Sequence, residues 1–282
     1  MTRLQSGDIL DIASQLKAYD GELVSKTGHT LRQIACHAVG LEEEDVGGIT
    51  ASLTVGVVPI QWGQGVIEGF CDATAGILRY LGFRAFVTGQ SDVLGIAEAC
   101  AARADVVFLS DDDDFVAIPI QTRQYVHNAE ATGRGFAAGL DLMAGGLGDR
   151  RVVVLGCGPV GRSAVSTLLN YGAIVSIYDT NADSCREFIN TLSARDSNRI
   201  KIAADIKTAV AGHALVVDAT PAAGIIGARA ISPQTYIAAP GMPLGLSRRA
   251  LEKVSDRILH DPLQLGVATM AMTVVKQLMP PG

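Results

Sequence analysis

The sequence has few charged and aromatic residues, and it lacks a long uninterrupted apolar run. Charged residues make up 18% and aromatic residues 5% of its 282 positions, against 48% for hydrophobic residues. A membrane span needs about 18 or more consecutive apolar residues, and no such stretch is present. Because there are enough apolar side chains to bury a core, disorder is not expected either. We therefore expect a globular protein outside the membrane, long enough for two domains.

Paired cysteines are also missing. The five cysteines, Cys36, Cys71, Cys100, Cys157 and Cys185, are odd in number and contain no C-x-x-C pair. A disulfide framework needs an even number, and a zinc ribbon needs closely spaced pairs, so we expect reduced thiols. The sequence has no cluster of His, Cys, Asp and Glu with metal-ligand spacing and no G-x-S-x-G nucleophile elbow. Neither a metal site nor serine-hydrolase chemistry is expected.

An excess of basic residues is absent as well, since 23 Lys and Arg stand against 29 Asp and Glu, a formal charge of −6. Nucleic-acid phosphates are bound by clustered Lys and Arg, so we expect no nucleic-acid partner. The segment Met1 to Asp8 lacks the apolar core of a secretory signal, which favours a cytoplasmic location. With nucleic acid and membrane excluded, we expect the partner to be a small-molecule substrate. The apolar stretch Leu265 to Leu278 is compatible with a homodimer.

The most informative motif is a G-x-G-x-x-G sequence that follows the apolar run Val152 to Leu155 and leads into a helical pattern. Its positions are Gly156, Cys157, Gly158, Pro159, Val160 and Gly161. The first glycine permits a tight turn from strand to helix, the second lets the backbone approach a pyrophosphate, and the third lets helix and strand pack closely. Free N–H groups at the helix N-terminus suit phosphate oxygens. The motif predicts a dinucleotide cofactor, and Cys157 needs only to be small.

An acidic residue stands where this motif requires one. Asp179 ends the next apolar strand, 18 residues after Gly161. A carboxylate there can accept hydrogen bonds from the ribose hydroxyls, and it would repel a 2′-phosphate. The sequence therefore favours NAD over NADP.

The apolar periodicity predicts an α/β protein, with a small N-terminal α/β domain that has a helical extension and a C-terminal doubly wound Rossmann domain. We expect residues 1–127 to form the N-terminal substrate-binding domain and residues 128–282 the Rossmann domain with connecting and closing helices. The extension comprises a helix with Asp8 as N-cap, a helix near 31–39 and an acidic loop at 42–45. Strands are then expected at 53–60, 86–88 and 106–109, and in the second half at 152–155, 174–178, 200–202, 215–217, 236–238 and 258–259.

Ligands of open α/β sheets bind beyond the carboxyl ends of the strands, and the segments found there are polar or turn-rich. The turns after the later strands carry Thr220, Pro221 and Pro240, which could contact cofactor or could simply end strands. His260 and Asp261 follow the last strand, where either could exchange a proton with substrate. These turns are expected to surround the nicotinamide half of the cofactor.

Four consecutive carboxylates, Asp111 to Asp114, follow a strand that is expected to be buried. Runs of charge are usually solvated, so we expect a loop or a helix entry there. Asp111 and Asp112 lie closest to the strand end and are candidates to line an interdomain cleft, whereas Asp113 and Asp114 are expected to face solvent. Such a cleft would select a cationic substrate, for example one with amines.

The whole chain resembles the pyrrolysine biosynthesis protein PylD family. G-x-G-x-x-G and the Ala219-Thr220-Pro221 turn occur in many dehydrogenases, but the N-terminal segments are specific to this family. The matching segments are 55–59, 63–67, 82–83, 86–88, 91–93, 110–112, 156–161, 219–221, 240–243 and 262–263.

The resemblance implies NAD-dependent oxidation of the primary amine of 3-methylornithyl-N6-lysine, followed by closure of a pyrroline ring with release of ammonia and water. It also implies substrate contacts from Leu4, Ser110, Asp111 and Asp261, and cofactor contacts from the glycine motif, Asp179 and the Thr220-Pro221 turn. A carboxylate suits the amines, so Asp261 is the candidate proton acceptor, with His260 behind it and Asp111 as a further catalytic candidate.

Two departures from the family pattern stand out. The family leads us to expect Glu at the position of Asp261 and small polar residues in place of Gln61 and Trp62, so Asp261 could need a bridging water and Trp62 could narrow the pocket. Two other functions remain open: a dehydrogenase of a simpler amino acid or imine, and a non-catalytic NAD sensor. The first would accept free ornithine or lysine, and the second would reduce no NAD.

Overall fold

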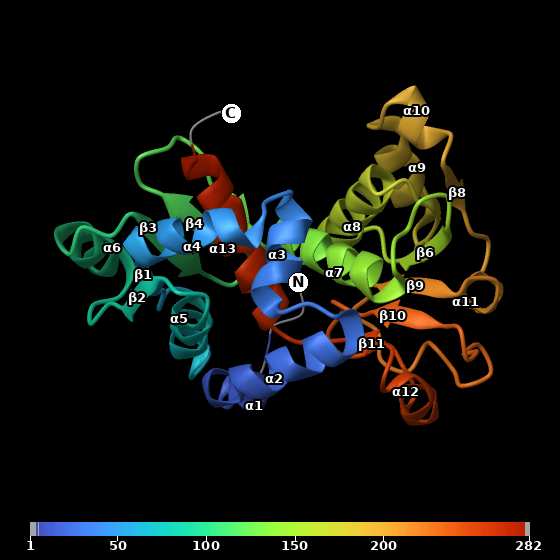
Figure 1. Cartoon of the computed structure of the whole chain (residues 1–282), viewed down its shortest axis with the longest axis horizontal. Coiled ribbons are helices and arrows are strands. Elements are labelled where there is room, and N and C mark those ends of the chain that lie inside the picture. The colour runs from blue at the N-terminus through green and yellow to red at the C-terminus, as the bar shows by residue number, and fades with distance from the viewer. Residues whose placement is uncertain (1–3, 5, 280–282) are drawn as a thin grey trace.

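The computed structural model describes residue 4 and residues 6–279. Two β-sheets lie at opposite ends of the molecule (Figure 1). Between them run two long helices, α7 (Asn128–Ala144) and α13 (Gln264–Leu278), which contact each other. Helix α7 also contacts elements from both ends of the molecule, and α13 contacts the N-terminal sheet and helices. The predicted α/β class with two sheets is confirmed.

The N-terminal sheet has five strands in the order β2-β1-β3-β4-β5. They are β1 (Thr54–Pro59), β2 (Arg84–Val87), β3 (Val106–Ser110), β4 (Phe115–Pro119) and β5 (Val126–His127). The three predicted strands pair in parallel, with β1 in the centre. The sequence pattern missed β4 and β5, which pair antiparallel. They arise because Asp111 to Asp114 form a tight reversal, so β4 folds straight back on β3 without a helix.

Two helices, α5 (Phe70–Tyr80) and α6 (Asp92–Ala101), connect the parallel strands. The α6 helix packs on the sheet through its smallest residues. A Cβ on Gly95 would lie 2.5 Å from a methyl group of Val58, and one on Gly56 would lie 2.9 Å from Ala99. Helix and strand approach so closely that larger side chains are excluded from this contact. Val93, one of the apolar residues that predict the helix, is 78% exposed.

Four helices form the N-terminal extension: α1 (Ser6–Ile9), α2 (Ile12–Thr27), α3 (Leu31–Val39) and α4 (Glu43–Ser52). Ile9, Ile12, Leu16 and Leu23 are buried, as their spacing predicts. Asp8 does not cap the long helix, because it lies inside α1. The expected acidic loop is also wrong, since its acidic residues occupy the first turn of α4, where the helix dipole favours negative charge.

The C-terminal sheet has six parallel strands in the order β11-β10-β9-β6-β7-β8, the doubly wound Rossmann arrangement. The strands are β6 (Arg151–Leu155), β7 (Ile174–Tyr178), β8 (Ile200–Ile202), β9 (Leu215–Asp218), β10 (Tyr236–Ala238) and β11 (Ile258–Leu259). The helices are α8 (Pro159–Asn170), α9 (Ala182–Asn190), α10 (Ala194–Ser197), α11 (Ile206–Ala211) and α12 (Arg248–Val254). All six predicted strands are present, and the strand order reverses between β6 and β9.

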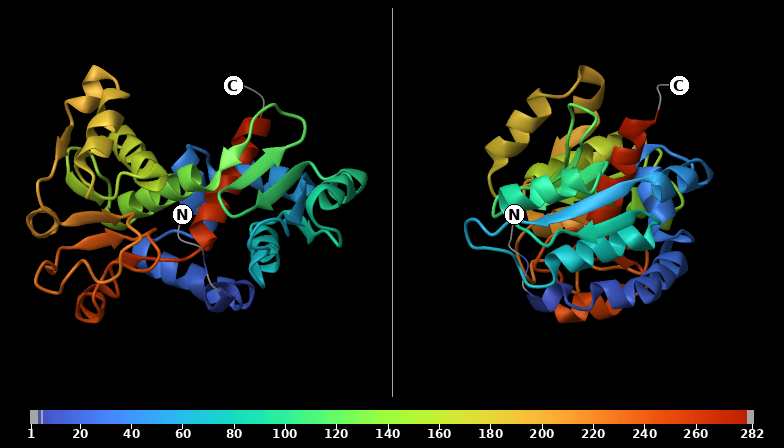
Figure 2. Two further views of the ribbon diagram at one scale, coloured as in Figure 1. Left: turned by 180° about the vertical axis from the view of Figure 1, so that it is seen from behind. Right: turned by 90° about the vertical axis from the view of Figure 1, so that its left-hand side faces the viewer.

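Helix α7 packs closely against its neighbours because it is rich in glycine and alanine. A Cβ on Gly133 would lie 2.7 Å from Ser163 on α8, and one on Gly139 would lie 2.5 Å from Leu259 on β11. Figure 2 shows α7 and α13 running through the middle of the molecule. Helix α7 also contacts β4 and β5, so a domain division between residues 127 and 128 stays a prediction. No helix in the described part of the chain is long and apolar enough to cross a membrane.

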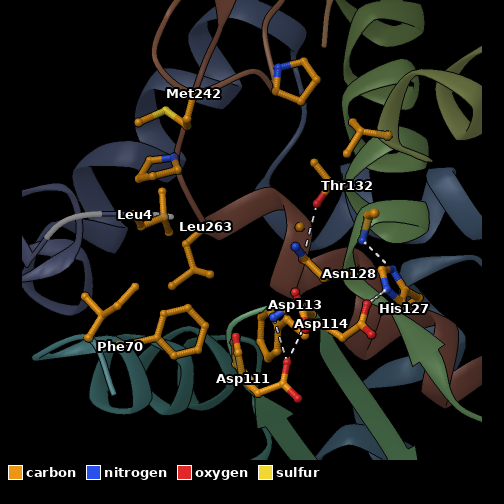
Figure 3. A pocket seen from close by; sticks show the side chains of 18 of the residues that line it. Leu4, Phe70, Asp111, Asp113, Asp114, His127, Asn128, Thr132, Met242 and Leu263 are labelled. Carbon is orange, nitrogen blue, oxygen red and sulfur yellow. Dashed lines mark hydrogen bonds and ion pairs between the residues drawn. The ribbon is translucent and has the colours of Figure 1, made fainter. Parts of the chain in front are cut away.

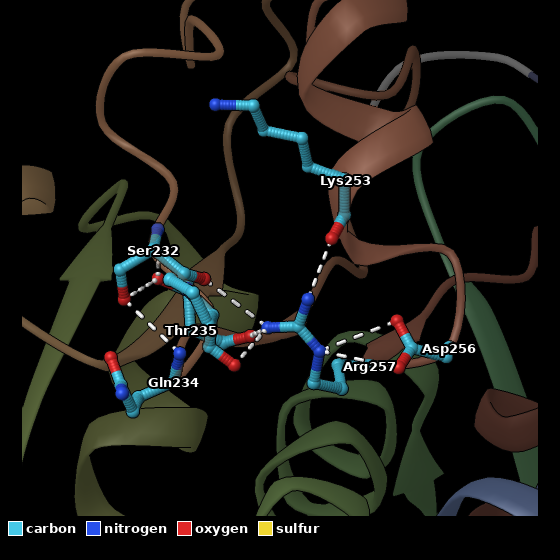
Figure 4. Close-up of polar contacts among 7 residues, drawn as sticks. Ser232, Gln234, Thr235, Lys253, Asp256 and Arg257 are labelled. Atoms are coloured by element: carbon cyan, nitrogen blue, oxygen red, sulfur yellow. Dashed lines mark hydrogen bonds and ion pairs between the residues drawn. The ribbon is translucent and has the colours of Figure 1, made fainter.

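A single arginine ties the irregular segment before β10 to the end of α12 (Figure 4). The guanidinium of Arg257 donates to the carbonyl oxygens of Pro233 at 2.7 Å, Thr235 at 2.9 Å and Lys253 at 2.6 Å. A planar group with five donors can satisfy several loop carbonyls that have no partner in a sheet or helix. This network holds β10 and β11 in place, and with them the turns that follow both strands.

We expect Gly133→Ala to lower the free energy of unfolding, because its methyl group would press on Ser163 and force α7 away from α8. Overpacking of this kind costs about 1–3 kcal/mol. The matched control is Gly21→Ala on α2, where a Cβ meets nothing within 4 Å. That change should stabilise the protein by up to about 1 kcal/mol, because alanine is the better helix former. Urea unfolding followed by circular dichroism measures both, and equal effects of the two changes would contradict the close-packing argument.

Candidate active site

A cavity of about 650 Å³ opens between the two sheets. One wall comes from the carboxyl ends of β1 and β3, and the other from the glycine motif and the turns after β9, β10 and β11. It brings together most of the residues that the sequence singled out: Leu4, Ser110, Asp111, Gly158, Pro159, Val160, Thr220, Pro221, Pro240 and Asp261. Gly156, Gly161, Asp179 and His260 lie outside its lining.

The first and third glycines of the motif are required by packing. Gly156 has φ +93°, and a Cβ there would lie 2.8 Å from the carbonyl oxygen of Ala219. A Cβ on Gly161 would overlap the carbonyl oxygen of Gly156. These two glycines are needed to form the turn between β6 and α8. That role does not require them to line the cavity.

The second glycine is different, because nothing in the protein requires it. Gly158 is the N-cap of α8, and a Cβ there would meet no atom within 4 Å. The space above it belongs to the cavity, and the free N–H groups of the first turn of α8 are available to an anion. A pyrophosphate that approaches the backbone would occupy this space, so the site fits a dinucleotide.

The carboxylate of Asp179 lies against the same turn. Its Oδ2 accepts a hydrogen bond from the N–H of Cys157 at 2.7 Å, and Oδ1 accepts one from the N–H of Asn181 at 2.8 Å. Oδ1 also accepts a hydrogen bond from the hydroxyl of Thr180 at 3.4 Å, so Oδ2 is the oxygen that keeps a lone pair for a further donor, as a ribose hydroxyl would be. Burial raises the pKa of the Cys157 thiol, which agrees with a small packing residue rather than a reactive one.

The turn after β9 is organised by Asp218, which is fully buried. Its Oδ1 accepts hydrogen bonds from the hydroxyl of Thr220 at 2.7 Å and from the N–H of Thr220 at 3.2 Å. Burial raises the pKa of this carboxyl group, and the two bonds from Thr220 oppose that effect. Asp218 thus holds Thr220 and Pro221 at the cavity wall.

The four aspartates form the β3–β4 turn, and all of them line the cavity (Figure 3). Asp111 Oδ1 accepts hydrogen bonds from the N–H groups of Asp114 at 2.8 Å and Asp113 at 2.9 Å, which hold the pKa of its carboxyl group below the usual value. Asp113 and Asp114 are exposed, as expected, yet they also belong to the lining. Within the described residues the lining contains neither lysine nor arginine, so this wall is strongly anionic.

The sequence pattern did not single out His127, which the structure places in the cavity wall. Its Nδ1 accepts a hydrogen bond from the N–H of Ala129 at 3.1 Å, and its Nε2 lies 2.5 Å from Asp114 Oδ1. Since Nδ1 is an acceptor, the proton must lie on Nε2, which donates to the carboxylate. Both ring nitrogens are occupied, so this histidine caps α7 and holds the acidic turn.

Met242 and Leu263, labelled in Figure 3, lie in the turns after β10 and β11 that were expected to face the cofactor, and both line the cavity. Asn128 and Thr132 also line it but were missed. They lie on α7 without a recognisable motif, so only the position of that helix at the junction of the sheets could reveal them. Trp62, expected to narrow the pocket, is 85% exposed and lies outside the lining.

Asp261 is 5% exposed and bonded at both oxygens. Oδ1 accepts hydrogen bonds from the N–H groups of Leu263 and Leu265, each at 3.1 Å, and Oδ2 accepts one from the hydroxyl of Tyr19 at 2.6 Å. Burial raises the pKa of the Asp261 carboxyl group, while these donors and His260 oppose the rise. His260 itself bonds the carbonyl oxygen of Ala239 through Nδ1 at 2.7 Å, and its catalytic role stays a prediction.

Comparison with solved structures shows the fold. The chain is similar to shikimate dehydrogenase from Aquifex aeolicus, with a TM-score of 0.55 and 14% identity, covering 81% of this chain and 94% of that one. It is also similar to quinate dehydrogenase from Corynebacterium glutamicum in complex with NAD, with a TM-score of 0.53 and 14% identity over 82% and 95% of the two chains. Residues 124–234 match the alanine dehydrogenase/PNT C-terminal domain. The chain therefore has a Rossmann-type dehydrogenase fold.

Comparison of the sequence with families and with known proteins gives a more specific result than the comparison of structures. Residues 8–126 match the N-terminal domain of the pyrrolysine biosynthesis protein PylD. The chain is 28% identical to pyrrolysine synthase of Methanosarcina barkeri over 98% of both chains, and 27% identical to pyrrolysine synthase of Methanosarcina acetivorans over 98% of this chain and all of that one. The chain is thus similar to the PylD family in its N-terminal part and to pyrrolysine synthases along almost its whole length.

We expect Gly158→Ala to leave folding intact, because its Cβ points into open space, but to weaken the binding of NADH, because that space is where a pyrophosphate would lie. The Kd for NADH should rise by about tenfold or more, which corresponds to about 1.4 kcal/mol. Gly148→Ala, which also meets no atom within 4 Å and lies away from the cavity, is the control. Titration by NADH fluorescence measures both, and an unchanged Kd for Gly158→Ala would count against this position of the pyrophosphate.

Proposed function

We propose that the protein is a pyrrolysine synthase that oxidises the primary amine of 3-methylornithyl-N6-lysine with NAD. The observation that carries the proposal is the similarity to two pyrrolysine synthases along almost the whole chain, the substrate-side half included. The cavity adds a physical argument, because it joins a fingerprint for a dinucleotide to an anionic wall.

The anionic wall favours a substrate that carries amines. Ammonium groups are attracted by carboxylates, and Asp111 keeps its charge because backbone N–H groups stabilise it. An anionic substrate would meet five carboxylates, those of the β3–β4 turn and Asp261, and no lysine or arginine in the described lining. The neutral or cationic parts of a lysine conjugate suit this wall better than a substrate with clustered carboxylates.

The cofactor would be held by the backbone at Gly158, by the first turn of α8, by Asp179 and by the turn at Thr220 and Pro221. When bound, NAD accepts a hydride from the carbon that bears the amine. Thr220 is held rigidly by Asp218, so that this part of the wall keeps its shape.

The chain must also remove a proton, because a protonated amine has no lone pair to assist the departure of hydride. Asp261 is the proposed acceptor, since it lines the cavity and its raised pKa makes it a better base than an exposed aspartate. The oxidised carbon is then an imine, to which water adds as ammonia leaves, giving an aldehyde. The remaining amine attacks that aldehyde, and the ring closes to the pyrroline as water leaves. The water taken up in the previous step is thereby released again, so the net by-product of ring formation is ammonia.

A steady-state assay tests this function. Incubation with NAD and 3-methylornithyl-N6-lysine should give NADH, measured at 340 nm, and a pyrroline product, measured by mass spectrometry. Free ornithine and lysine are the comparison substrates. Turnover of these alone would favour a simpler amino-acid dehydrogenase, and NAD binding without any turnover would favour the sensor.

We expect Asp111→Asn to raise KM for the conjugate by about tenfold, or about 1.4 kcal/mol, because it removes a negative charge while its amide oxygen can still accept the N–H groups of the turn. Asp72→Asn makes the same charge change on an exposed residue of α5 outside the cavity and should leave KM unchanged. Equal KM values for the two variants would contradict the proposal that Asp111 contacts the substrate.

Preference for NAD over NADP is assigned to the charge of Asp179. We expect Asp179→Asn to lower the ratio of kcat/KM for NAD to that for NADP, since the amide oxygen can still accept the N–H of Cys157 but no longer repels a 2′-phosphate. The ratio is measured with both cofactors at saturating conjugate. A wild-type enzyme that prefers NADP would contradict the assignment at once.

A further inference from the structure

The proton acceptor of the proposed reaction is bonded to a residue from the other end of the chain. Tyr19 lies on α2, and its hydroxyl donates to Oδ2 of Asp261 at 2.6 Å. Tyr19 does not line the cavity, whereas Asp261 does. The Asp261 carboxylate therefore links Tyr19 to the cavity.

The bonds to Asp261 fix its orientation. The two backbone N–H groups from the start of α13 both approach Oδ1, and Tyr19 is the donor to Oδ2. A carboxylate has about four lone-pair sites. Oδ1 is filled by its two donors, so the site that remains for a proton from substrate is on Oδ2, beside the tyrosine hydroxyl.

We propose that Tyr19 is a positioning residue that orients Oδ2 of Asp261 toward the cavity as the proton acceptor. The inference rests on the proposed function. Without the hydroxyl, Oδ2 would have no hydrogen-bond donor among the described residues, and only the two backbone N–H groups on Oδ1 would hold the carboxylate. The N-terminal extension would then contribute to the chemistry as well as to the packing of the fold.

The charges around Tyr19 and Asp261 favour the tyrosine hydroxyl as the hydrogen-bond donor of this pair. Burial, followed by the charge of Asp261, raises the pKa of Tyr19 well above its usual value, and Glu22 and Asp20 on α2 act in the same direction. Tyr19 is therefore always protonated and cannot itself be the base. Its hydrogen bond lowers the pKa of Asp261, as does His260 after the last strand, against the larger effect of burial. Loss of the hydroxyl must raise that pKa.

The test is Tyr19→Phe in the full-length enzyme, with NADH formation from the conjugate measured as a function of pH. Asp261 must be ionised to accept a proton, so activity falls on the acid side, and a higher pKa moves that limb to higher pH. We expect this shift together with a fall in kcat of about tenfold or more, with KM for NAD unchanged.

The matched control is Tyr80→Phe. The hydroxyl of Tyr80 donates to Oδ2 of Asp20 at 2.7 Å, so the change removes the same kind of bond at a site outside the cavity. It should leave the pH profile as in the wild type. If Tyr19→Phe folds poorly, 3-fluorotyrosine placed at residue 19 keeps the ring and strengthens the donor, and it should move the acid limb to lower pH.

The outcomes separate the two proposals. If the wild type makes no NADH from the conjugate, the proposed function fails, and the Asp261 titration is followed by carbon-13 NMR of the carboxyl groups, assigned with Asp261→Asn. A higher titration midpoint in Tyr19→Phe than in the wild type supports the inference there too. An active wild type whose acid limb is the same in Tyr19→Phe and Tyr80→Phe overturns it, as does an unchanged midpoint.

Discussion

The fold is organised around the close contact of helix α7 with α8, α13 and β11. Helices that touch through glycine can approach to backbone distance, and here Gly133 and Gly139 permit that approach on both sides of α7. The same helix begins directly after β5 and packs on the N-terminal sheet. One rigid element thus sets how the carboxyl ends of the two sheets face each other, and the cavity is the space that remains between them.

The two walls of this cavity have opposite electrostatic character. The glycine motif presents backbone N–H groups and a helix N-terminus, which favour phosphate, while the β3–β4 turn presents carboxylates, which favour ammonium. His127 joins the acidic turn to the first turn of α7, so that the position of one wall is tied to the central helix. A dinucleotide and an amine-bearing substrate would therefore bind against different walls of the cavity, with their reacting ends between the two walls.

Much of this was readable from the sequence, because local rules decide it. The strands from 174–178 and 236–238, and the helix from 31–39, lie where their apolar pattern predicts. The pattern failed where a short segment had no periodicity to display, as in β4 and β5, and where small residues rather than large ones made the contact, as in α6. The acidic segment near residue 43 looked like a loop because charge alone does not distinguish a solvated loop from the first turn of a helix.

The cofactor motif, the Rossmann strand pattern and the acidic run can be identified from the amino-acid sequence alone, since each depends on residues close together in the chain. Which of these groups come into contact depends on the tertiary fold. Asp261 and Tyr19 are 242 positions apart, and the carboxylate gains its third hydrogen-bond donor only when the fold brings Tyr19 of α2 to the turn after β11. His127 likewise acquires its place from the turn at Asp114. Burial and long-range contacts set the orientation and pKa of such groups, and the order of residues along the chain carries no direct record of either.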